Sequence, residues 1–296
     1  MADDAAPPTR TYRGNCHCGN FVYTVTVPEI TKTSSCDCSV CSKKGVLWTV
    51  VPNHPEQFKV VKGDEEKDLS VYQWSSKALH HKARSPFLAG GSVLVRWPTG
   101  PLEKQMLLNT RCIQDFDVWK TPTSVFPGSK IGNPYQGPEY TGPEPTAADI
   151  KDAKTYHGSC HCGDIQLAYK TEPLTESTKV TECNCSICQR NAYLWTYPKA
   201  DQVVITGTPS LTTYSHGIHV FIKTFCSRCG VPIQNYARNL SSEELGKFPA
   251  EFASFYESAK TLQPVNLRLL NGFDFLAVKP EEANGWGTIE PQYVNP

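Results

Sequence analysis

The stretch Cys183-Asn184-Cys185-Ser186-Ile187-Cys188 places three thiols in a C-x-C-x-x-C pattern. Two further pairs frame it, Cys160-His161-Cys162 upstream and Cys226-Ser227-Arg228-Cys229 downstream. The two members of a C-x-C pair cannot easily bond to each other, but they can hold one ion together. These spacings therefore predict metal chemistry.

The number of cysteines also bears on the compartment. The chain has 296 residues and 13 cysteines, an odd number, and its first ten residues carry no secretory signal. Disulfide scaffolds occur mostly in short secreted chains, so we expect reduced thiolates in a cytoplasmic protein, with the nucleus as the alternative. Residues 1–10 are expected to form a disordered leader.

The charge balance argues against two classes of partner. The formal net charge is zero, so no basic surplus is present to neutralise phosphates, and nucleic acid is not expected as a partner. No apolar run reaches the roughly 18–20 residues that a membrane span needs, so we expect no membrane partner either.

The sequence repeats itself. Residues 12–19 return as residues 156–163, at an offset of 144, and the run from Cys36 through Cys38 to Cys41 returns as residues 183–188, at an offset of 147. Asn109 and Arg111 likewise return as Asn266 and Arg268. The repeat predicts two tandem domains, over residues 11–120 and 155–279.

The segments outside the two predicted domains are rich in proline and glycine. Residues 121–154 are expected to be an extended linker and residues 280–296 an irregular tail. Within the domains, residues 21–27, 203–206 and 219–225 have strand composition, and residues 241–256 have helical spacing that Pro249 interrupts. We therefore expect mainly β domains with short helices.

The two flanking cysteine pairs suit one closed site. Four thiolates from Cys160, Cys162, Cys226 and Cys229 can surround a tetrahedral Zn²⁺, and such a site contributes directly to folding. Free buried cysteines and a disulfide are the alternative interpretations.

The middle run offers three ligands and no obvious fourth nearby in sequence. A zinc with three protein ligands and one free position is the catalytic pattern, because water or substrate can occupy the opening. The alternative is that a distant histidine completes the site, with His216 and His219 as candidates.

The full order of motifs resembles a known family. Gly158-Ser159-Cys160-His161-Cys162-Gly163, then residues 183–188, then Phe225-Cys226-Ser227-Arg228-Cys229-Gly230 are similar to the glutathione-dependent formaldehyde-activating enzyme family, in which centromere protein V is also placed. The resemblance covers about 120 residues of the second copy and most of the first.

That resemblance implies two tandem β-tent domains, with a structural and a catalytic Zn²⁺ in the second. It implies that Cys160, Cys162, Cys226 and Cys229 bind the structural ion, and that Cys183, Cys185 and Cys188 bind the catalytic one. The implied activity is that of a carbon–sulfur lyase, read in reverse as S-(hydroxymethyl)glutathione synthase. Glutathione or another small thiol adduct is the implied partner, and Arg268 is a candidate for its carboxylate.

The first copy departs from the pattern. Cys16, Cys18 and the three cysteines at 36, 38 and 41 are present as candidate metal ligands, but the closing pair is absent, and Ser85 and Leu88 align with it. The first domain is therefore expected to be degenerate, with its structural zinc in doubt. An error in the gene model across residues 83–91 is the other interpretation.

Three functions remain in competition. The first is the zinc-dependent lyase, the second is an enzyme for another small metabolite, and the third is a non-catalytic zinc module for protein interaction.

Asp37 and Asn184, at matching places in the two C-x-C-x-x-C runs, are expected to face the open position of the metal.

Overall fold

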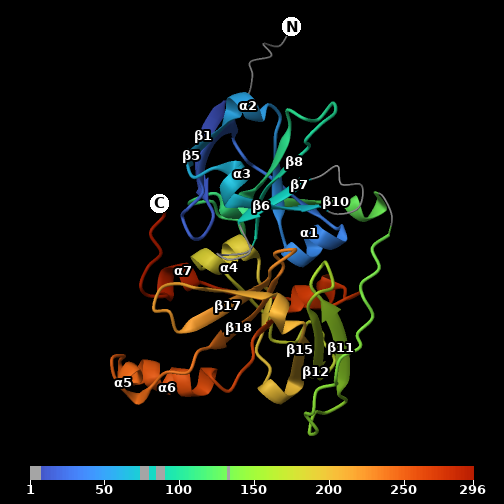
Figure 1. Cartoon of the computed structure of the whole chain (residues 1–296), viewed down its shortest axis with the longest axis vertical. Coiled ribbons are helices and arrows are strands. Elements are labelled where there is room, and N and C mark those ends of the chain that lie inside the picture. The colour runs from blue at the N-terminus through green and yellow to red at the C-terminus, as the bar shows by residue number, and fades with distance from the viewer. Residues whose placement is uncertain (1–7, 74–79, 85–90, 132–133) are drawn as a thin grey trace. The chain divides into compact units, whose positions relative to one another are not determined.

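The computed structural model describes residues 8–73, 80–84, 91–131 and 134–296 (Figure 1). The described chain divides into two units: the first holds the residues up to 134 together with 294–296, and the second holds residues 135–293. Each unit contains a three-stranded and a seven-stranded sheet with short helices in the connections. The prediction of a mainly β protein with short helices is confirmed.

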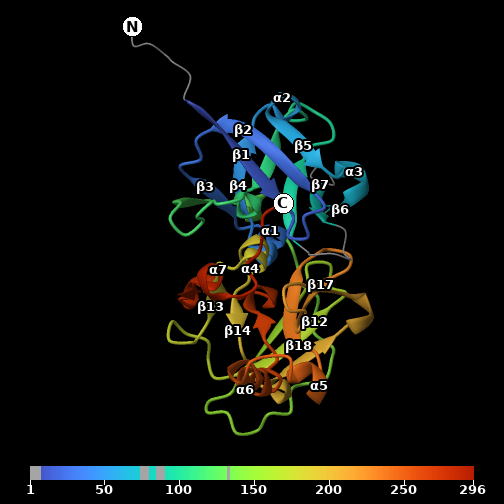
Figure 2. The same cartoon turned by 90° about the vertical axis from the view of Figure 1, so that its left-hand side faces the viewer.

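The small sheet of the first unit has the strand order β1-β2-β5 (Figure 2), and its large sheet has the order β10-β3-β4-β9-β8-β7-β6. The strands are β1 (Thr9–Asn15), β2 (Val22–Pro28), β3 (Thr33–Cys36), β4 (Leu47–Val51), β5 (Phe58–Lys62), β6 (Leu69–Gln73), β7 (His80–Arg84), β8 (Ser92–Arg96), β9 (Met106–Asn109) and β10 (Thr123–Phe126). The helices are α1 (Ser39–Lys44), α2 (His54–Gln57), α3 (Glu65–Asp68) and the 3-10 turns η1 (Thr110–Cys112) and η2 (Gly128–Lys130).

The second unit repeats this arrangement. Its sheets have the orders β11-β12-β15 and, read from its far edge, β20-β13-β14-β19-β18-β17-β16. The strands are β11 (Lys154–Ser159), β12 (Gln166–Thr171), β13 (Thr181–Cys183), β14 (Trp195–Thr196), β15 (Val203–Thr206), β16 (Leu211–Ser215), β17 (Phe221–Cys226), β18 (Pro232–Ala237), β19 (Val265–Asn266) and β20 (Glu281–Ala283). The helices are α4 (Ser186–Asn191), α5 (Ser242–Leu245), α6 (Ala250–Ala259), α7 (Gly285–Thr288) and the 3-10 turns η3 (Ala200–Gln202), η4 (Thr208–Ser210), η5 (Leu267–Leu269) and η6 (Phe275–Ala277).

Alternating side chains on the strands build the core. In β2, Val25 and Val27 are buried while Thr26 between them is exposed, as the two-residue period of a strand requires. They join a cluster that takes residues from both sheets, including Leu94 of β8 and Leu108 of β9. The strands expected from composition are present as β2, β15 and β17, with ends shifted by up to two residues.

The helical stretch expected over residues 241–256 forms two helices instead of one. Ser241 caps α5, because its Oγ accepts a hydrogen bond from Glu244 N at 3.1 Å and Glu244 Oε2 accepts one from Ser241 N at 2.9 Å. Pro249 then stands immediately before α6, where its missing N–H costs nothing. No helix in the described part of the chain is long and apolar enough to cross a bilayer.

The segments expected to be a linker and a tail each add a strand to a large sheet. Strand β10 runs parallel to β3, with Phe126 opposite Cys36, and β20 runs parallel to β13, with Ala283 opposite Cys183. Prolines at 122, 127 and 280 fall outside these strands, at the edge of each sheet, so they remove no ladder hydrogen bond. We call residues 121–131 the first arm and residues 280–289 the second arm.

The remainder of the expected linker is irregular but packed on the second unit. The Tyr135 ring stacks on His161 at 4.6 Å between ring centroids, and the Tyr140 ring stacks on His157 at the same distance. Ala147 N donates to Asp201 O at 3.0 Å. These contacts explain why a segment rich in proline is nevertheless ordered: ring stacking and single backbone bonds replace regular secondary structure.

Candidate metal centres

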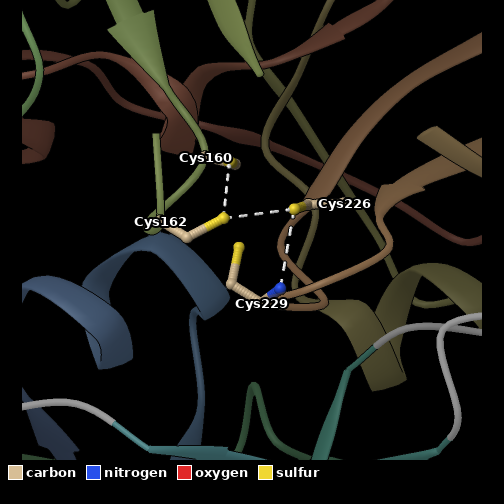
Figure 3. Close-up of side chains that lie close together, drawn as sticks. All are labelled: Cys160, Cys162, Cys226 and Cys229. Atoms are coloured by element: carbon tan, nitrogen blue, oxygen red, sulfur yellow. Dashed lines mark hydrogen bonds between the residues drawn. The ribbon is translucent and has the colours of Figure 1, made fainter. Parts of the chain in front are cut away.

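The four cysteines of the outer pairs meet in the second unit (Figure 3). Cys160 and Cys162 lie in the turn between β11 and β12, and Cys226 and Cys229 lie in the turn between β17 and β18. Their sulfurs all lie within 4.8 Å of one another, with Cys162 Sγ 3.5 Å from Cys160 Sγ and 3.4 Å from Cys226 Sγ. The group therefore joins the small sheet of this unit to its large sheet.

These distances suit a metal better than a disulfide. A tetrahedral site with Zn–S bonds of about 2.3 Å places its sulfurs about 3.8 Å apart, whereas a disulfide needs about 2.05 Å. All thirteen cysteines are free, and Cys160, Cys226 and Cys229 are almost wholly buried. A soft, closed set of four thiols fits Zn²⁺.

The pKa values of the thiols in this group are shifted in opposite directions. The hydrogen bond from Cys160 lowers the pKa of Cys162 to about 6, while the pKa of Cys160 itself is raised by its contact with Cys162. A group that already favours one thiolate at neutral pH is prepared to exchange its remaining protons for a metal ion.

The three cysteines of the middle run form a second group. Cys183 ends β13, Cys185 caps the N-terminus of α4, and Cys188 lies in the first turn of α4, so their sulfurs come within 4.8 Å of one another. Hydrogen bonds from Cys185 and then Cys188 lower the pKa of Cys183 to about 3. Trp195 Nε1 donates to Cys188 Sγ at 3.3 Å and fixes the orientation of that ligand.

No fourth cysteine, histidine or carboxylate joins this group among the residues that the structure describes. His219 Nδ1 is hydrogen-bonded to Ser215 Oγ at 3.0 Å, and His216 stacks on Tyr214 at 6.0 Å between centroids. Burial lowers the pKa of His216 to about 4. The alternative interpretation, in which one of these histidines completes the site, therefore finds no support among the described residues.

The first unit has an equivalent three-thiol group. Cys36 ends β3 and Cys38 and Cys41 belong to the start of α1, with all three sulfurs within 4.8 Å. Hydrogen bonds from Cys38 and Cys41 lower the pKa of Cys36 to about 3, as at Cys183. The local geometry that favours a metal thus survives in the first unit.

The four-thiol group has no counterpart in the described part of the first unit. Cys16 Sγ and Cys18 Sγ lie 3.2 Å apart, without a third candidate ligand among the described residues. Ser85 and Leu88, which the sequence comparison aligned with Cys226 and Cys229, lie outside the described residues. Strand register adds a detail: Leu69 pairs with Arg84 where Leu211 pairs with Cys226, so Arg84 occupies the strand position of Cys226.

Each arm contacts the first cysteine of its three-thiol group. The backbone N–H of Gly285 donates to Cys183, and that of Gly128 donates to Cys36. A Cβ at Gly285 would lie 2.5 Å from Cys183 Sγ, and one at Gly128 would lie 2.3 Å from Cys36 Sγ. The close approach requires glycine at both places, and sequence analysis missed it because the two arms share little sequence.

The residue between the first two cysteines of each three-thiol run forms hydrogen bonds with the arm of the same unit. Asp37 accepts hydrogen bonds from Ser129 N at 2.7 Å and Ser129 Oγ at 2.9 Å, and Asn184 Oδ1 accepts one from Trp286 N at 2.8 Å. Asp37 and Asn184 were expected to face the open metal position. Their oxygens instead satisfy the backbone N–H groups at the start of a short helical turn in each arm.

The Asn and Arg residues that recur in the two units form hydrogen bonds just after the helix, α1 or α4, that carries the last cysteine of each three-thiol group. Arg268 Nε donates to Ala192 O at 2.7 Å, and Arg111 Nε donates to Gly45 O at 2.9 Å, in each case just after α4 or α1. Asn266 Oδ1 accepts from Leu194 N at 3.2 Å. This places Arg268 in a structural contact, and its predicted contact with glutathione stays a prediction.

Comparison with known proteins agrees with the site. Residues 155–261 match the model of a family described as glutathione-dependent formaldehyde-activating enzyme, and this range includes all seven cysteines of the two groups in the second unit. A solved crystal structure of a Rhodobacter sphaeroides protein is also similar, at 22% identity and a TM-score of 0.31, over 40% of this chain and 92% of that one. The resemblance read from the motifs is thus confirmed for the second unit.

Proposed function

We propose that the second unit is a zinc-dependent carbon–sulfur lyase that acts on S-(hydroxymethyl)glutathione or a related thiol adduct. The observation that carries this proposal is a buried three-thiol group with no fourth ligand among the described residues, inside the segment that matches the family model. The family is enzymatic and of this reaction type, while the substrate itself is part of the proposal.

Three thiols at this spacing fit Zn²⁺, which prefers sulfur ligands and tolerates an open fourth position. Bound there, the ion would lower the pKa of an incoming thiol, so that the sulfur is held as a thiolate. Three thiolate ligands donate much charge, so we propose that the site holds and orients sulfur and does not strongly activate a carbonyl.

The chain's own residues hold the ligands and keep water away. Cys185 and Cys188 are buried, and Tyr193 and Trp195 pack against them. In the cleavage direction, the carbon–sulfur bond of the adduct breaks and its electron pair stays on sulfur, while the hydroxyl group gives its proton to solvent as formaldehyde leaves. Binding the thiol sulfur more tightly as a thiolate favours this bond cleavage.

For the first unit we propose a metal site without lyase activity. Its three-thiol group matches that of the second unit, but the described residues supply only two cysteines toward a four-thiol group. The proposal therefore predicts three zinc ions in each chain, two in the second unit and one in the first. Metal analysis of the purified protein measures this number directly.

Thirteen free cysteines also suit a reducing compartment, so we propose that the protein works in the cytoplasm. We propose no nucleic-acid partner, because the net charge is zero.

The central test is an assay of the zinc-loaded protein with glutathione and formaldehyde, with the spontaneous reaction subtracted. We expect acceleration by the parent protein and its loss in Cys185→Ser. The matched variant Cys38→Ser, at the same position of the first unit, is expected to keep most of the activity. No acceleration by the parent, or equal losses in the two variants, would contradict the proposal.

A further inference from the structure

A buried lysine stands beside the three-thiol group of the second unit. Lys223 lies in β17 and is only 8% exposed. Its ammonium is 4.6 Å from the centre of the Trp195 ring and 5.5 Å from that of Tyr193. Among the described residues its ammonium forms neither a salt bridge nor a hydrogen bond, although burying an unpaired cation is unfavourable.

The negative charge available to Lys223 is that of the thiols. Trp195 links the two, because its ring face lies under the ammonium while its Nε1 donates to Cys188 Sγ at 3.3 Å. The two rings that contact the ammonium, those of Tyr193 and Trp195, also pack against Cys185 and Cys188. The lysine is therefore a counter-charge for the metal ligands.

Tyr193 is a second unsatisfied group at the same place. Its side chain is wholly buried and stacks on Trp195 at 4.1 Å between centroids, and its hydroxyl has no hydrogen-bond partner among the described residues. The Tyr193 ring packs against Cys185 and Cys188, so its hydroxyl is placed close to the three-thiol group with a hydrogen bond still to donate. A buried hydroxyl without a partner is unfavourable, so a ligand that accepts a hydrogen bond from it would recover this loss.

The charges at the site show what such a ligand would be. Zn²⁺ with three thiolates carries one net negative charge, and a fourth thiolate would raise this to two. In a buried site that second charge is unfavourable unless a cation balances it. Lys223 supplies one positive charge, which stabilises the site with a bound thiolate, at two negative charges, more than the site with a neutral ligand, at one.

We propose that Lys223 and Tyr193 make the open position of the second unit's three-thiol group selective for an anionic sulfur ligand, a thiolate, over neutral ligands. Lys223 balances the added charge, and Tyr193 donates a hydrogen bond to the ligand. Both are positioning residues. The inference deepens the proposed function, on which it rests for the metal and for the open position.

The described part of the first unit shows no equivalent of this pair. The residue equivalent to Tyr193, two before the shared tryptophan, is Val46. Lys43 and Lys44 are the first unit's buried lysines among the residues whose burial is described, and Lys44 Nζ donates to Ser92 Oγ at 3.1 Å. We therefore assign selectivity for a thiolate to the second unit alone.

The test uses the intact protein loaded with Co²⁺, whose absorption reports each new ligand at the open position. 2-Mercaptoethanol serves as the probe that binds as a thiolate and imidazole as the neutral probe. We expect Lys223→Met to weaken 2-mercaptoethanol binding about tenfold and to leave imidazole affinity within about twofold of the parent. Lys223→Arg restores thiolate binding, and Tyr193→Phe weakens it about threefold.

The outcomes separate the inference from the proposed function. Equal weakening of both probes in Lys223→Met, or thiolate affinity that does not change, overturns the inference, because packing alone would then explain the lysine. If the parent binds cobalt but neither probe changes its spectrum, the open position itself is absent and the proposed function fails as well. Cobalt in the first unit is common to all variants and cancels in the differences.

Discussion

The two units share their strand order, their three-thiol groups and their arms, but they differ in the four-thiol group. In the second unit this group joins the β11–β12 turn of the small sheet to the β17–β18 turn of the large sheet. In the first unit the two sheets are packed by a cluster of apolar side chains, including Tyr23, Leu94 and Leu108. The comparison indicates that the three-thiol geometry does not require the four-thiol group, which has no counterpart among the described residues of the first unit.

The largest difference should come from removing one ligand of the four-thiol group. Cys226→Ser is expected to unfold or loosen the second unit, because a structural zinc contributes many kcal/mol to folding. Cys16→Ser, in the first unit, should cost far less. Thermal unfolding with zinc analysis measures both. If Cys226→Ser has the same melting temperature as the parent, or if Cys16→Ser lowers the melting temperature as much as Cys226→Ser does, the proposed difference between the two units is disproved.

The arms provide a change that should affect both units alike. Gly285→Ala and Gly128→Ala each place a Cβ less than 3 Å from a metal-ligand sulfur, so the arm must move and its N–H bond to that sulfur is lost. We expect metal affinity at the affected three-thiol group to fall about 10–100-fold. Competition with a chromophoric chelator measures the affinity. Gly246→Ala, whose new Cβ would meet its nearest atom at 3.3 Å, is the control.

The paired arginines test whether one of them has acquired a second role. Arg268→Lys and Arg111→Lys should each lower the free energy of unfolding by about 2 kcal/mol, because each loses its Nε bond to the carbonyl after a metal-carrying helix. Denaturant unfolding measures this loss. A rise in KM for glutathione in Arg268→Lys, beyond what its stability explains, would show that Arg268 also binds substrate.

Acid should destabilise the second unit through His216. Burial lowers its folded pKa from 6.5 to about 4, so between these pH values the unfolded chain binds the extra proton and stability falls as pH falls. The effect is at most about 1.4 kcal/mol for each pH unit. Stability of the zinc-loaded protein measured from pH 6.5 to 5 should depend less on pH in His216→Gln. An identical slope in the two proteins would refute this.

The smallest effect concerns the residue that ends each metal-carrying helix. Gly45 has φ of 58° after α1, and Ala192 has φ of 51° after α4, a region in which a Cβ costs about 1–2 kcal/mol. Ala192→Gly should therefore stabilise the second unit by less than about 1 kcal/mol, after the entropy cost of glycine. Gly45→Ala should destabilise the first unit, and unfolding curves of the two variants compare them.

The sequence predicted the parts whose signal is local. The cysteine spacings indicated which thiols meet, because each pair or trio lies in one turn and needs little knowledge of the rest of the fold. The strand composition indicated β2, β15 and β17 for the same reason. Pro249 was correctly identified as an interruption, and the structure uses it as the start of α6.

The parts that depend on long-range pairing were not predictable. Strands β10 and β20 join their sheets through parallel partners about 90–100 residues earlier, and their prolines resemble those of a linker. The bond between Arg268 and Ala192 also joins residues far apart in sequence. Lys223 was missed because one lysine in a strand forms no motif. What distinguishes it is burial without a carboxylate partner among the described residues, and this becomes visible only in the folded chain.

Because each arm follows the cysteines in sequence, each three-thiol group is synthesised before the segment that covers it. In both units the three cysteines precede the arm by many residues, so a growing chain presents its thiols before the glycine that closes over them has been made. Each centre is thus exposed to the surrounding medium during synthesis, and ions or oxidants can reach its sulfurs. In each unit, this exposure ends when the arm that carries the glycine has been translated and has joined the sheet.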